Sequence, residues 1–415
     1  MNSVIIPPSK SITQRAIVCA SLAKGTSIIK NPLFSEDVNY LINAFKKLGV
    51  LIRKIDNNLE IKGNSGEFTP NGNKKIFMGN NGTGFRFLIP ICCIYPDLVE
   101  LTGNERMKNR PIAELVDVLN DNGFEIKYLE KNDFPPILCK KSNLKLKRIK
   151  ISSKNSSQFV SSLLLSSPLF LDDFEIEIAG EIPSMPYIDL TLMVMRFFGV
   201  SVKRKDNSFF ISKNSKYIAC EFEVEGDFSS ASYFLSFPFF SGKEIIVENL
   251  NYYNSIQPDK IFVDILKRMG GKFNISDKNI KVFPGKLNGI TINMKNSPDI
   301  VPTLSVLSSI SKGETIITGI SHLKIKESDR IYAIYKNLKK FGIDVICGDD
   351  FIKIKGNEKK IKETKEVSVE TFNDHRIAMS FSLFKLLGIN VNFDNPECVK
   401  KSFPNYWEIF NTIKL

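Results

Sequence analysis

The sequence is poor in the residues on which metal and redox sites depend. It has only two histidines among 415 residues, and its seven cysteines include no Cys-x-x-Cys pair. Because the cysteines are odd in number and scattered, neither a zinc site nor a disulfide framework is predicted. We therefore expect a protein that binds no metal.

Nucleotide-binding and membrane-spanning patterns are also missing. No Walker-type loop and no strand-linked Gly-x-Gly-x-x-Gly motif occurs, which argues against a nucleotide cofactor. No apolar run reaches about 18 residues, and residues 1–8 lack the basic and apolar regions of a secretory signal. We expect a cytoplasmic protein with no cofactor and no membrane contact.

The net charge of +12 raises the alternative of a nucleic-acid-binding protein. However, the basic residues lie in short, dispersed groups such as Lys46-Lys47 and Lys400-Lys401, and they are not interleaved with aromatic residues that could stack on bases. A lysine-rich surface with some cations gathered around small anionic ligands is the favoured interpretation. The length predicts two domains.

A helix, a glycine and a β-rich segment recur along the chain. The glycines that end these predicted helices are Gly49, Gly123, Gly199, Gly270 and Gly342, which are 74, 76, 71 and 72 residues apart. Glycine suits this place because the residue after a helix often adopts the left-handed conformation. Six α/β units of roughly 70 residues then account for the chain, three in each domain, with a crossover near 225–226.

Each unit also contains an earlier helix whose start is small or polar. These starts lie at Ser9–Ser11, Gly82–Thr83, Ser156–Gln158, Asp227–Ser230, Pro298–Asp299 and Asp374–Arg376. Unpaired backbone N–H groups at a helix start attract anions, and several of these starts add cations or hydroxyls. The recurrence in both halves predicts an enzyme that acts on small polyanions.

Three helix starts allow two interpretations each. In Lys324–Arg330, Ser328 is the expected N-cap, while the added cations of Lys326 and Arg330 suggest a bound anion. Asp299 can be a simple cap or a general base. Arg110 precedes Pro111, which is expected at the first position of a helix. Arg110 is either solvated or binds a carboxylate or phosphate through two parallel hydrogen bonds.

Ten stretches together resemble the 5-enolpyruvylshikimate-3-phosphate synthase family. They are PSKSITQRA, GNNGTGFR, RMKNRPIAELVDVL, SSQFVSSLLL, PSMPYIDLTL, VEGDFSSASYF, SPDIVPTLSVL, KIKESDRI, NDHRIAMSFSL and KKSFPNYW. They follow the family's order from Pro8 to Trp407. The resemblance implies an α/β fold of two similar domains, each of three βαβαββ units in a pseudo-threefold inverse barrel. Residues 9–225 would form one domain and residues 1–8 plus 226–415 the other, with the active site in the interdomain cleft.

The resemblance also implies a reaction. The family transfers the enolpyruvyl group of phosphoenolpyruvate to the 5-hydroxyl of shikimate 3-phosphate and releases phosphate, by addition and elimination through a tetrahedral intermediate. This step belongs to the shikimate pathway to chorismate and the aromatic amino acids. A monomer that closes its domains on the two substrates, without nucleic acid, is implied as well.

The family's site residues carry over position by position. Those matching shikimate 3-phosphate ligands are Lys10, Ser11, Arg15, Ser156, Ser157, Gln158, Ser184, Asp299, His322 and Lys326. Those matching phosphoenolpyruvate ligands are Lys10, Gly82, Arg110, Gln158, Arg330, Arg376 and Lys401. Asp299 matches the proton acceptor and Glu327 the proton donor, and Lys10 is the third catalytic residue implied.

Two positions depart from the family pattern, and one bears on inhibition. His322 stands where many members have Asn, and Phe87 stands where many have Pro. Gly82 matches the form that leaves room for glyphosate, so sensitivity to that inhibitor is expected. The alternative, the sister transferase acting on UDP-N-acetylglucosamine, fits less well because residues 103–110 contain no cysteine, where that enzyme often carries a reactive one.

Overall fold

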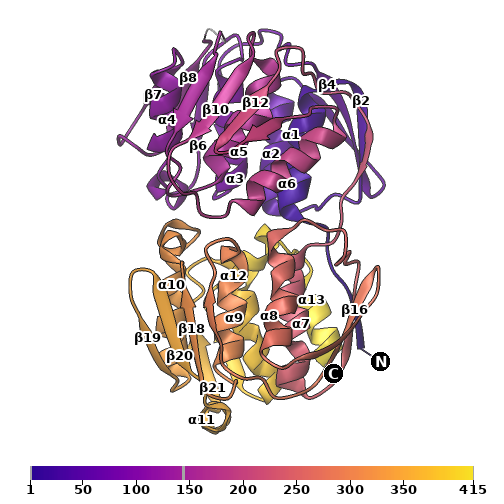
Figure 1. Cartoon of the computed structure of the whole chain (residues 1–415), viewed down its shortest axis with the longest axis vertical. Helices are drawn as coiled ribbons and strands as arrows, with labels where there is room; N and C mark the ends of the chain where they lie inside the picture. The colour runs from indigo at the N-terminus through magenta and orange to yellow at the C-terminus, as the bar shows by residue number, and fades with distance from the viewer. Residues whose placement is uncertain (1, 143–144, 415) are drawn as a thin grey trace. The chain divides into compact units, whose positions relative to one another are not determined.

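The computed structural model describes residues 2–142 and 145–414, and the chain folds into two compact units. The N-terminal unit is Ser9–Val224, and the C-terminal unit combines Met1–Pro8 with Glu225–Leu415. In Figure 1 the first runs from indigo to magenta and most of the second from salmon to yellow.

The middle repeat of the N-terminal unit shows the plan of all three. Its elements are β5 (Lys74–Phe77), α3 (Gly82–Cys92), β6 (Val99–Thr102), α4 (Ala113–Asn120), β7 (Glu125–Tyr128) and β8 (Ile137–Lys140). Strands β5 and β6 are parallel and joined through α3, whereas β8 is antiparallel to both β6 and β7. The sheet order β5-β6-β8-β7 is therefore that of a βαβαββ unit.

The third repeat follows the same plan, and the first is completed by the end of the unit. The third has β9 (Arg148–Ile151), α5 (Gln158–Ser166), β10 (Phe174–Ile178), α6 (Pro186–Phe197), β11 (Lys203–Lys205) and β12 (Ser208–Ile211). The first has α1 (Lys10–Leu22), β2 (Lys24–Lys30), α2 (Glu36–Lys47), β3 (Leu51–Ile55) and β4 (Asn58–Asn64). Its missing first strand is β13 (Glu221–Glu223), which pairs in parallel with β2.

The C-terminal unit borrows its first strand from the other end of the sequence. Strand β1 (Asn2–Ile5) pairs in parallel with β14 (Ile245–Glu248). The rest of this repeat is α7 (Phe228–Ser241), α8 (Ile261–Arg268), β15 (Lys272–Ile275) and β16 (Asn279–Phe283). The chain thus crosses between the units twice, after β1 and after β13.

The remaining repeats of the C-terminal unit differ in size. One has β17 (Thr291–Asn293), α9 (Val301–Ser308), β18 (Glu314–Thr318), α10 (Arg330–Lys340), β19 (Asp344–Cys347) and β20 (Phe351–Lys355). The last has β21 (Glu366–Val369), α12 (His375–Phe381), β22 (Asn390–Phe393) and α13 (Tyr406–Lys414), with α11 (Glu358–Glu363) before it. Its sheet has two strands among the described residues.

The first helix of each repeat is buried on nearly every side. In α1 every residue except Ser11 is buried, and α9 is buried throughout. The second helices, such as α2, bury only one face. Because a helix enclosed by apolar neighbours leaves polar backbone groups unpaired only at its ends, its start is where polar chemistry can be placed.

The structure confirms the predicted fold class. The five glycines that end the second helices all have positive φ, between 71° at Gly342 and 102° at Gly270. One detail of the prediction was wrong: α4 begins at Ala113, so Pro111 lies before the helix and not at its first position. Within residues 2–142 and 145–414, no helix combines the length and apolar character needed to span a bilayer.

Candidate active site

The start of α1 holds a buried lysine in an ion pair. Lys10 Nζ lies 3.0 Å from Asp37 Oδ2 on α2, and both side chains are buried. The main-chain carbonyl of Asp37 in turn accepts a 2.7 Å hydrogen bond from Asn81, the N-cap of α3. Lys10 is thereby held at the helix start, and Asp37 is a site residue that the sequence prediction missed.

Arg15 lies one turn further along α1 and is 2% exposed. Its Nε donates to Thr191 Oγ1 at 2.8 Å, and its two terminal nitrogens donate to the carbonyls of Ser11 and Tyr187 at 2.9 and 3.2 Å. Burial lowers the pKa of Arg15 to about 10, so the guanidinium is still charged at neutral pH. These contacts join α1 to α6 around a buried cation.

Gly82 and Arg110, both predicted to bind phosphoenolpyruvate, are in close contact. Arg110 is buried and donates from Nη1 to the carbonyl of Asn80 at 3.2 Å. A Cβ added to Gly82 would lie 2.4 to 2.6 Å from three guanidinium atoms of Arg110. Gly82 is therefore required for this approach of the arginine to the start of α3.

The starts of α3 and α5 are linked by side-chain hydrogen bonds. Arg86 Nη1 donates to Gln158 Oε1 at 2.7 Å, and Gln158 Nε2 donates to Thr83 Oγ1 at 2.9 Å. Arg86 was not among the predicted site residues, although it lies in the GNNGTGFR stretch. The structure thus adds a cation beside the predicted ligand Gln158.

The predicted serines lie at the starts of α5 and α6. Ser156 Oγ accepts from the main-chain N–H of Gln158 at 3.2 Å, and Ser157 is the residue before α5. Ser184 adopts φ 61°, a conformation that is strained for a residue other than glycine. Its buried Oγ has no hydrogen-bond partner among the described residues.

In the C-terminal unit, Arg330 is fully buried and contacts three carboxylates. Its Nε donates to Asp374 Oδ2 at 2.8 Å, and its terminal nitrogens donate to Glu327 Oε2 at 2.8 Å and to Asp299 Oδ1 at 2.9 Å. Burial alone would lower the pKa of Arg330, but the three anions outweigh it and raise the pKa above its ordinary value. Asp374 was not predicted as a site residue.

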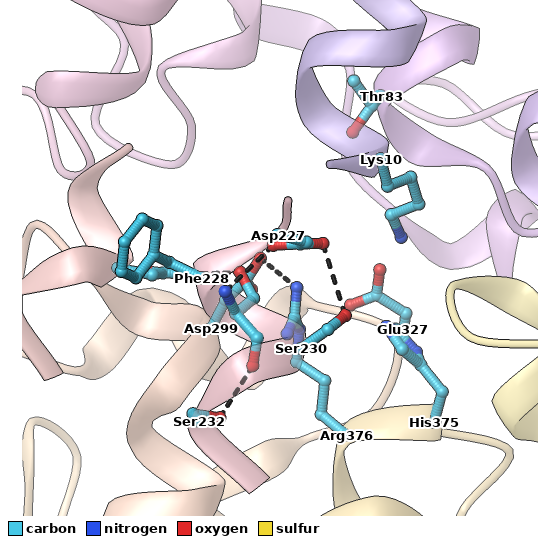
Figure 2. A network of polar contacts seen from close by, with 12 residues as sticks. Lys10, Thr83, Asp227, Phe228, Ser230, Ser232, Asp299, Glu327, His375 and Arg376 are labelled. Carbon is cyan, nitrogen blue, oxygen red and sulfur yellow. Dashed lines mark hydrogen bonds and ion pairs between the residues drawn. The ribbon is translucent and has the colours of Figure 1, made fainter. Parts of the chain in front are cut away.

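Asp299 lies between two guanidinium groups. Arg376 donates to its second oxygen, Oδ2, at 2.6 Å, and Figure 2 shows these two side chains pointing toward each other. Burial opposes the charge on Asp299, but Arg376, Arg330 and Lys326 outweigh it and hold the pKa of this carboxyl below its usual range. Asp299 is not a helix cap, because it lies within the 3-10 helix Pro298–Ile300 that precedes α9.

The predicted N-cap of α10 was wrong by one residue. Asp329 caps the helix by accepting a hydrogen bond from the N–H of Tyr332 at 3.0 Å. Ser328 instead donates from Oγ to Asp374 Oδ2 at 3.0 Å. Asp374 is itself the N-cap of α12 and accepts from the N–H of Arg376, so one carboxylate ties together the loop before α10 and the start of α12.

His322, Lys326 and Lys401 lie in or next to short 3-10 helices of the C-terminal unit. His322 is buried, and burial together with Lys326 lowers its pKa to about 3, so the ring is neutral. Its Nε2 has no hydrogen-bond partner within the described residues. Lys326 follows the 3-10 helix Ser321–Ile325, and the buried Lys401 ends the 3-10 helix Pro396–Lys401.

Two further buried carboxylates lie at the start of α7. Asp227 is its N-cap and accepts from the N–H of Ser229 at 2.9 Å. Asp259 accepts from Ser229 Oγ and is 1% exposed. Burial, reinforced by the charge of Asp299, raises the pKa of Asp259 to about 7. The sequence offered no signal for Asp259 beyond a carboxylate next to an apolar helix.

The described residues thus provide two complementary sets of groups. The N-terminal unit gathers buried cations and hydroxyls at the starts of α1, α3, α5 and α6. The C-terminal unit gathers arginines and carboxylates at the starts of α7, α9, α10 and α12. Cations suit phosphate and carboxylate ligands, and paired carboxylates suit proton transfer.

Comparisons with known proteins agree with this chemistry. The family model for EPSP synthase (3-phosphoshikimate 1-carboxyvinyltransferase) matches residues 1–410. Among curated proteins, the 3-phosphoshikimate 1-carboxyvinyltransferase of Haemophilus influenzae (strain PittEE) is 40% identical, over 100% of this chain and 96% of its own length. That of Histophilus somni (strain 2336) is 39% identical over 99% of this chain and 96% of its own.

Solved structures show the same fold. The EPSP synthase from Acinetobacter baumannii superposes with a TM-score of 0.78 at 25% identity, covering 99% of this chain and 95% of its own. The enolpyruvyl transferase NikO from Streptomyces tendae gives 0.77 at 13% identity, covering 100% and 94%. The fold, the site chemistry and the match along the whole chain lead to one conclusion: the chain belongs to the EPSP synthase family.

Proposed function

We propose that residues of both units carry out the family's reaction on one pair of substrates. This chain transfers the enolpyruvyl group of phosphoenolpyruvate to shikimate 3-phosphate in aromatic biosynthesis. The acceptor is its 5-hydroxyl, and phosphate leaves after a tetrahedral intermediate. The observation that best supports the proposal is the ionised Asp299 held between Arg330 and Arg376. Glu327 also forms an ion pair with Arg330.

Shikimate 3-phosphate is bound mainly by the N-terminal unit. Its proposed ligands there are Lys10, Ser11, Arg15, Ser156, Ser157, Gln158 and Ser184, and those in the C-terminal unit are Asp299, His322 and Lys326. The buried cations of α1 and the strained, unpartnered Ser184 support this assignment, because each gains a partner when an anion or hydroxyl binds.

Phosphoenolpyruvate carries a phosphate and a carboxylate, and forked guanidinium groups suit both. Its proposed ligands are Lys10, Gly82, Arg110, Gln158, Arg330, Arg376 and Lys401. Gly82 contributes space and not charge, because only glycine allows the observed position of Arg110.

Asp299 is the proposed base for the 5-hydroxyl, and Glu327 the proposed acid for the methylene carbon. The guanidinium neighbours keep Asp299 ionised, which a base requires. The ion pair between Glu327 and Arg330 favours the charged form of Glu327, whereas donation requires the protonated form. A substrate anion that engages Arg330 competes for this guanidinium, so substrate binding itself would favour protonation of Glu327.

The reaction run in D2O tests this assignment. Addition places a solvent hydrogen on the methylene carbon, and elimination from the resulting methyl group removes one of three hydrogens. The vinyl group of the product should therefore contain deuterium, and product without deuterium would contradict addition at this carbon.

A pair of variants tests the donor. Glu327→Gln should slow turnover and deuterium incorporation by about a hundredfold or more, the scale of general acid catalysis. Asp329→Asn is the matched control in the same loop, since Asn also caps helices, and it should retain near-normal turnover. A Glu327→Gln enzyme that turns over like Asp329→Asn would refute the donor role.

We also propose that the protein works in the cytoplasm, and that it is a monomer, as the family resemblance implies. Sedimentation at micromolar concentration tests whether the protein is a monomer. A single species of about 46.9 kDa is expected, and a concentration-dependent larger species would contradict it.

A further inference from the structure

The guanidinium of Arg15 lies over the ring of Phe87, with its Cζ 5.2 Å from the ring centroid. Arg15 belongs to α1 and Phe87 to α3, both in the N-terminal unit, and the Phe87 side chain is fully buried. At this distance the electron-rich ring face attracts the cation, and the attraction is stronger when both groups are desolvated.

The other contacts of Arg15 are all with neutral groups. Its three hydrogen bonds go to a hydroxyl and two carbonyls, and no carboxylate pairs with it anywhere in residues 2–142 and 145–414. By contrast, Lys10 is paired with Asp37, and Arg330 contacts three carboxylates. A guanidinium has five N–H donors, and Arg15 uses three of them in these hydrogen bonds. Within the described residues the other two donors remain for a ligand, and the positive charge is not neutralised by an anion.

The same contact recurs in the next repeat. Arg86 of α3 lies over the ring of Phe159 of α5, with 5.1 Å between Cζ and the centroid. Thus arginines on two successive first helices each rest on a phenylalanine of the following first helix. An aromatic face can hold a buried guanidinium in place without cancelling the charge that an anionic ligand needs.

We propose that Phe87 is a positioning residue for the reaction: its ring fixes the Arg15 guanidinium by one face and leaves its charge to shikimate 3-phosphate. The inference rests on the proposed role of Arg15 as a ligand of that substrate. A carboxylate in the place of the ring would hold Arg15 equally well but would compete with the substrate anion.

Graded fluorination of the Phe87 ring tests the proposal, because fluorine withdraws electron density from the ring face while changing its shape little. The KM for shikimate 3-phosphate should rise stepwise, by roughly three- to tenfold for trifluorophenylalanine, as expected for loss of a buried cation–π contact. The KM for phosphoenolpyruvate, kcat and the melting temperature should change little. A purely structural role of Phe87 would instead change the melting temperature and both KM values together.

Phe85 provides the matched control. It lies on the same helix and is equally buried, and within the described residues no cation lies over its ring. Fluorination at position 85 should leave the KM for shikimate 3-phosphate unchanged. A flat response at position 87, or an equal response at the two positions, would overturn the proposal.

Arg15→Met separates this inference from the proposed function. If Arg15→Met raises the KM for shikimate 3-phosphate but the Phe87 series is flat, the positioning role of Phe87 is refuted and the ligand role of Arg15 stands. If Arg15→Met leaves that KM unchanged, the ligand role itself is wrong and the inference falls with it.

Discussion

Arg376 and Asp299 form a 2.6 Å hydrogen bond between Nη2 and Oδ2, although they are 77 residues apart and lie in different repeats of the C-terminal unit. Arg330 occupies the other oxygen of the same carboxylate. The two guanidinium groups therefore keep Asp299 ionised, and the carboxylate in turn orients both arginines.

Asp299→Asn should remove the proposed general base and weaken the contacts that hold Arg330 and Arg376 in place. We expect kcat for phosphate release to fall by about a hundredfold or more. The free energy of unfolding should fall by about 2 kcal/mol, because Arg376 loses its ion-pair partner. Both quantities can be measured on one preparation, by phosphate release and by urea unfolding. Turnover within a few-fold of the parent enzyme would show that Asp299 is not the base.

Gly82→Ala should displace Arg110, since the new methyl group would lie 2.4 to 2.6 Å from its guanidinium. We expect the KM for phosphoenolpyruvate to rise and inhibition by glyphosate to weaken, with little change in the KM for shikimate 3-phosphate. Gly285→Ala is a suitable control because a Cβ there meets nothing within 4 Å. The parent enzyme should be inhibited by glyphosate in competition with phosphoenolpyruvate, and no inhibition at millimolar glyphosate would contradict the Gly82 assignment.

Asp259 should make the protein less stable as the pH rises. Its pKa is raised to about 7 by burial and by Asp299, so between pH 4 and 7 the folded state binds a proton that the unfolded state has released. The stabilising effect of this proton is complete below the unfolded pKa and is lost as the pH rises through 7. Asp259→Asn, which resembles the protonated form, should reduce the loss of unfolding free energy between pH 5 and 8 by roughly 2 to 3 kcal/mol.

Urea unfolding at several pH values measures this effect, and Asp277→Asn serves as the control because Asp277 is exposed in the same unit. The control should follow the parent profile. An Asp259→Asn profile parallel to that of the parent would mean that Asp259 is already ionised in the folded protein.

His322 should act in the opposite direction. Its pKa is lowered to about 3 by burial and by Lys326, so the folded state binds fewer protons than the unfolded state between pH 3 and 6.5. Stability is therefore lost as the pH falls below 6.5. His322→Asn should remove about 2 kcal/mol of the stability difference between pH 7.5 and 5. An unchanged pH profile of thermal unfolding would contradict a buried neutral imidazole.

Local sequence patterns were sufficient to predict the repeats. Helix periodicity and the five glycines with positive φ mark the first five units, and the polar helix starts lie at or just before α1, α3, α5, α7, α9 and α12. Because these features depend only on residues close together in the sequence, they can be predicted from short sequence segments. The choice between Ser328 and Asp329 as a cap could not be made in this way, because Ser328 is drawn to Asp374, 46 residues away.

The pairing of charges could not be predicted for the same reason. Nothing near Arg330 indicates that Asp299 and Asp374 reach it, and nothing near Lys10 indicates Asp37. Burial and the neighbouring charges together decide which carboxylates are ionised, and both depend on packing between repeats. The opposite pKa shifts of Asp259 and Asp299 are therefore visible only in the folded chain.

The most direct test of the account is phosphate release from phosphoenolpyruvate, measured with shikimate 3-phosphate and with UDP-N-acetylglucosamine in separate reactions. We predict stoichiometric release with shikimate 3-phosphate, and none above background with the nucleotide sugar. Release that depends on UDP-N-acetylglucosamine, or no release with shikimate 3-phosphate, would contradict the assigned function.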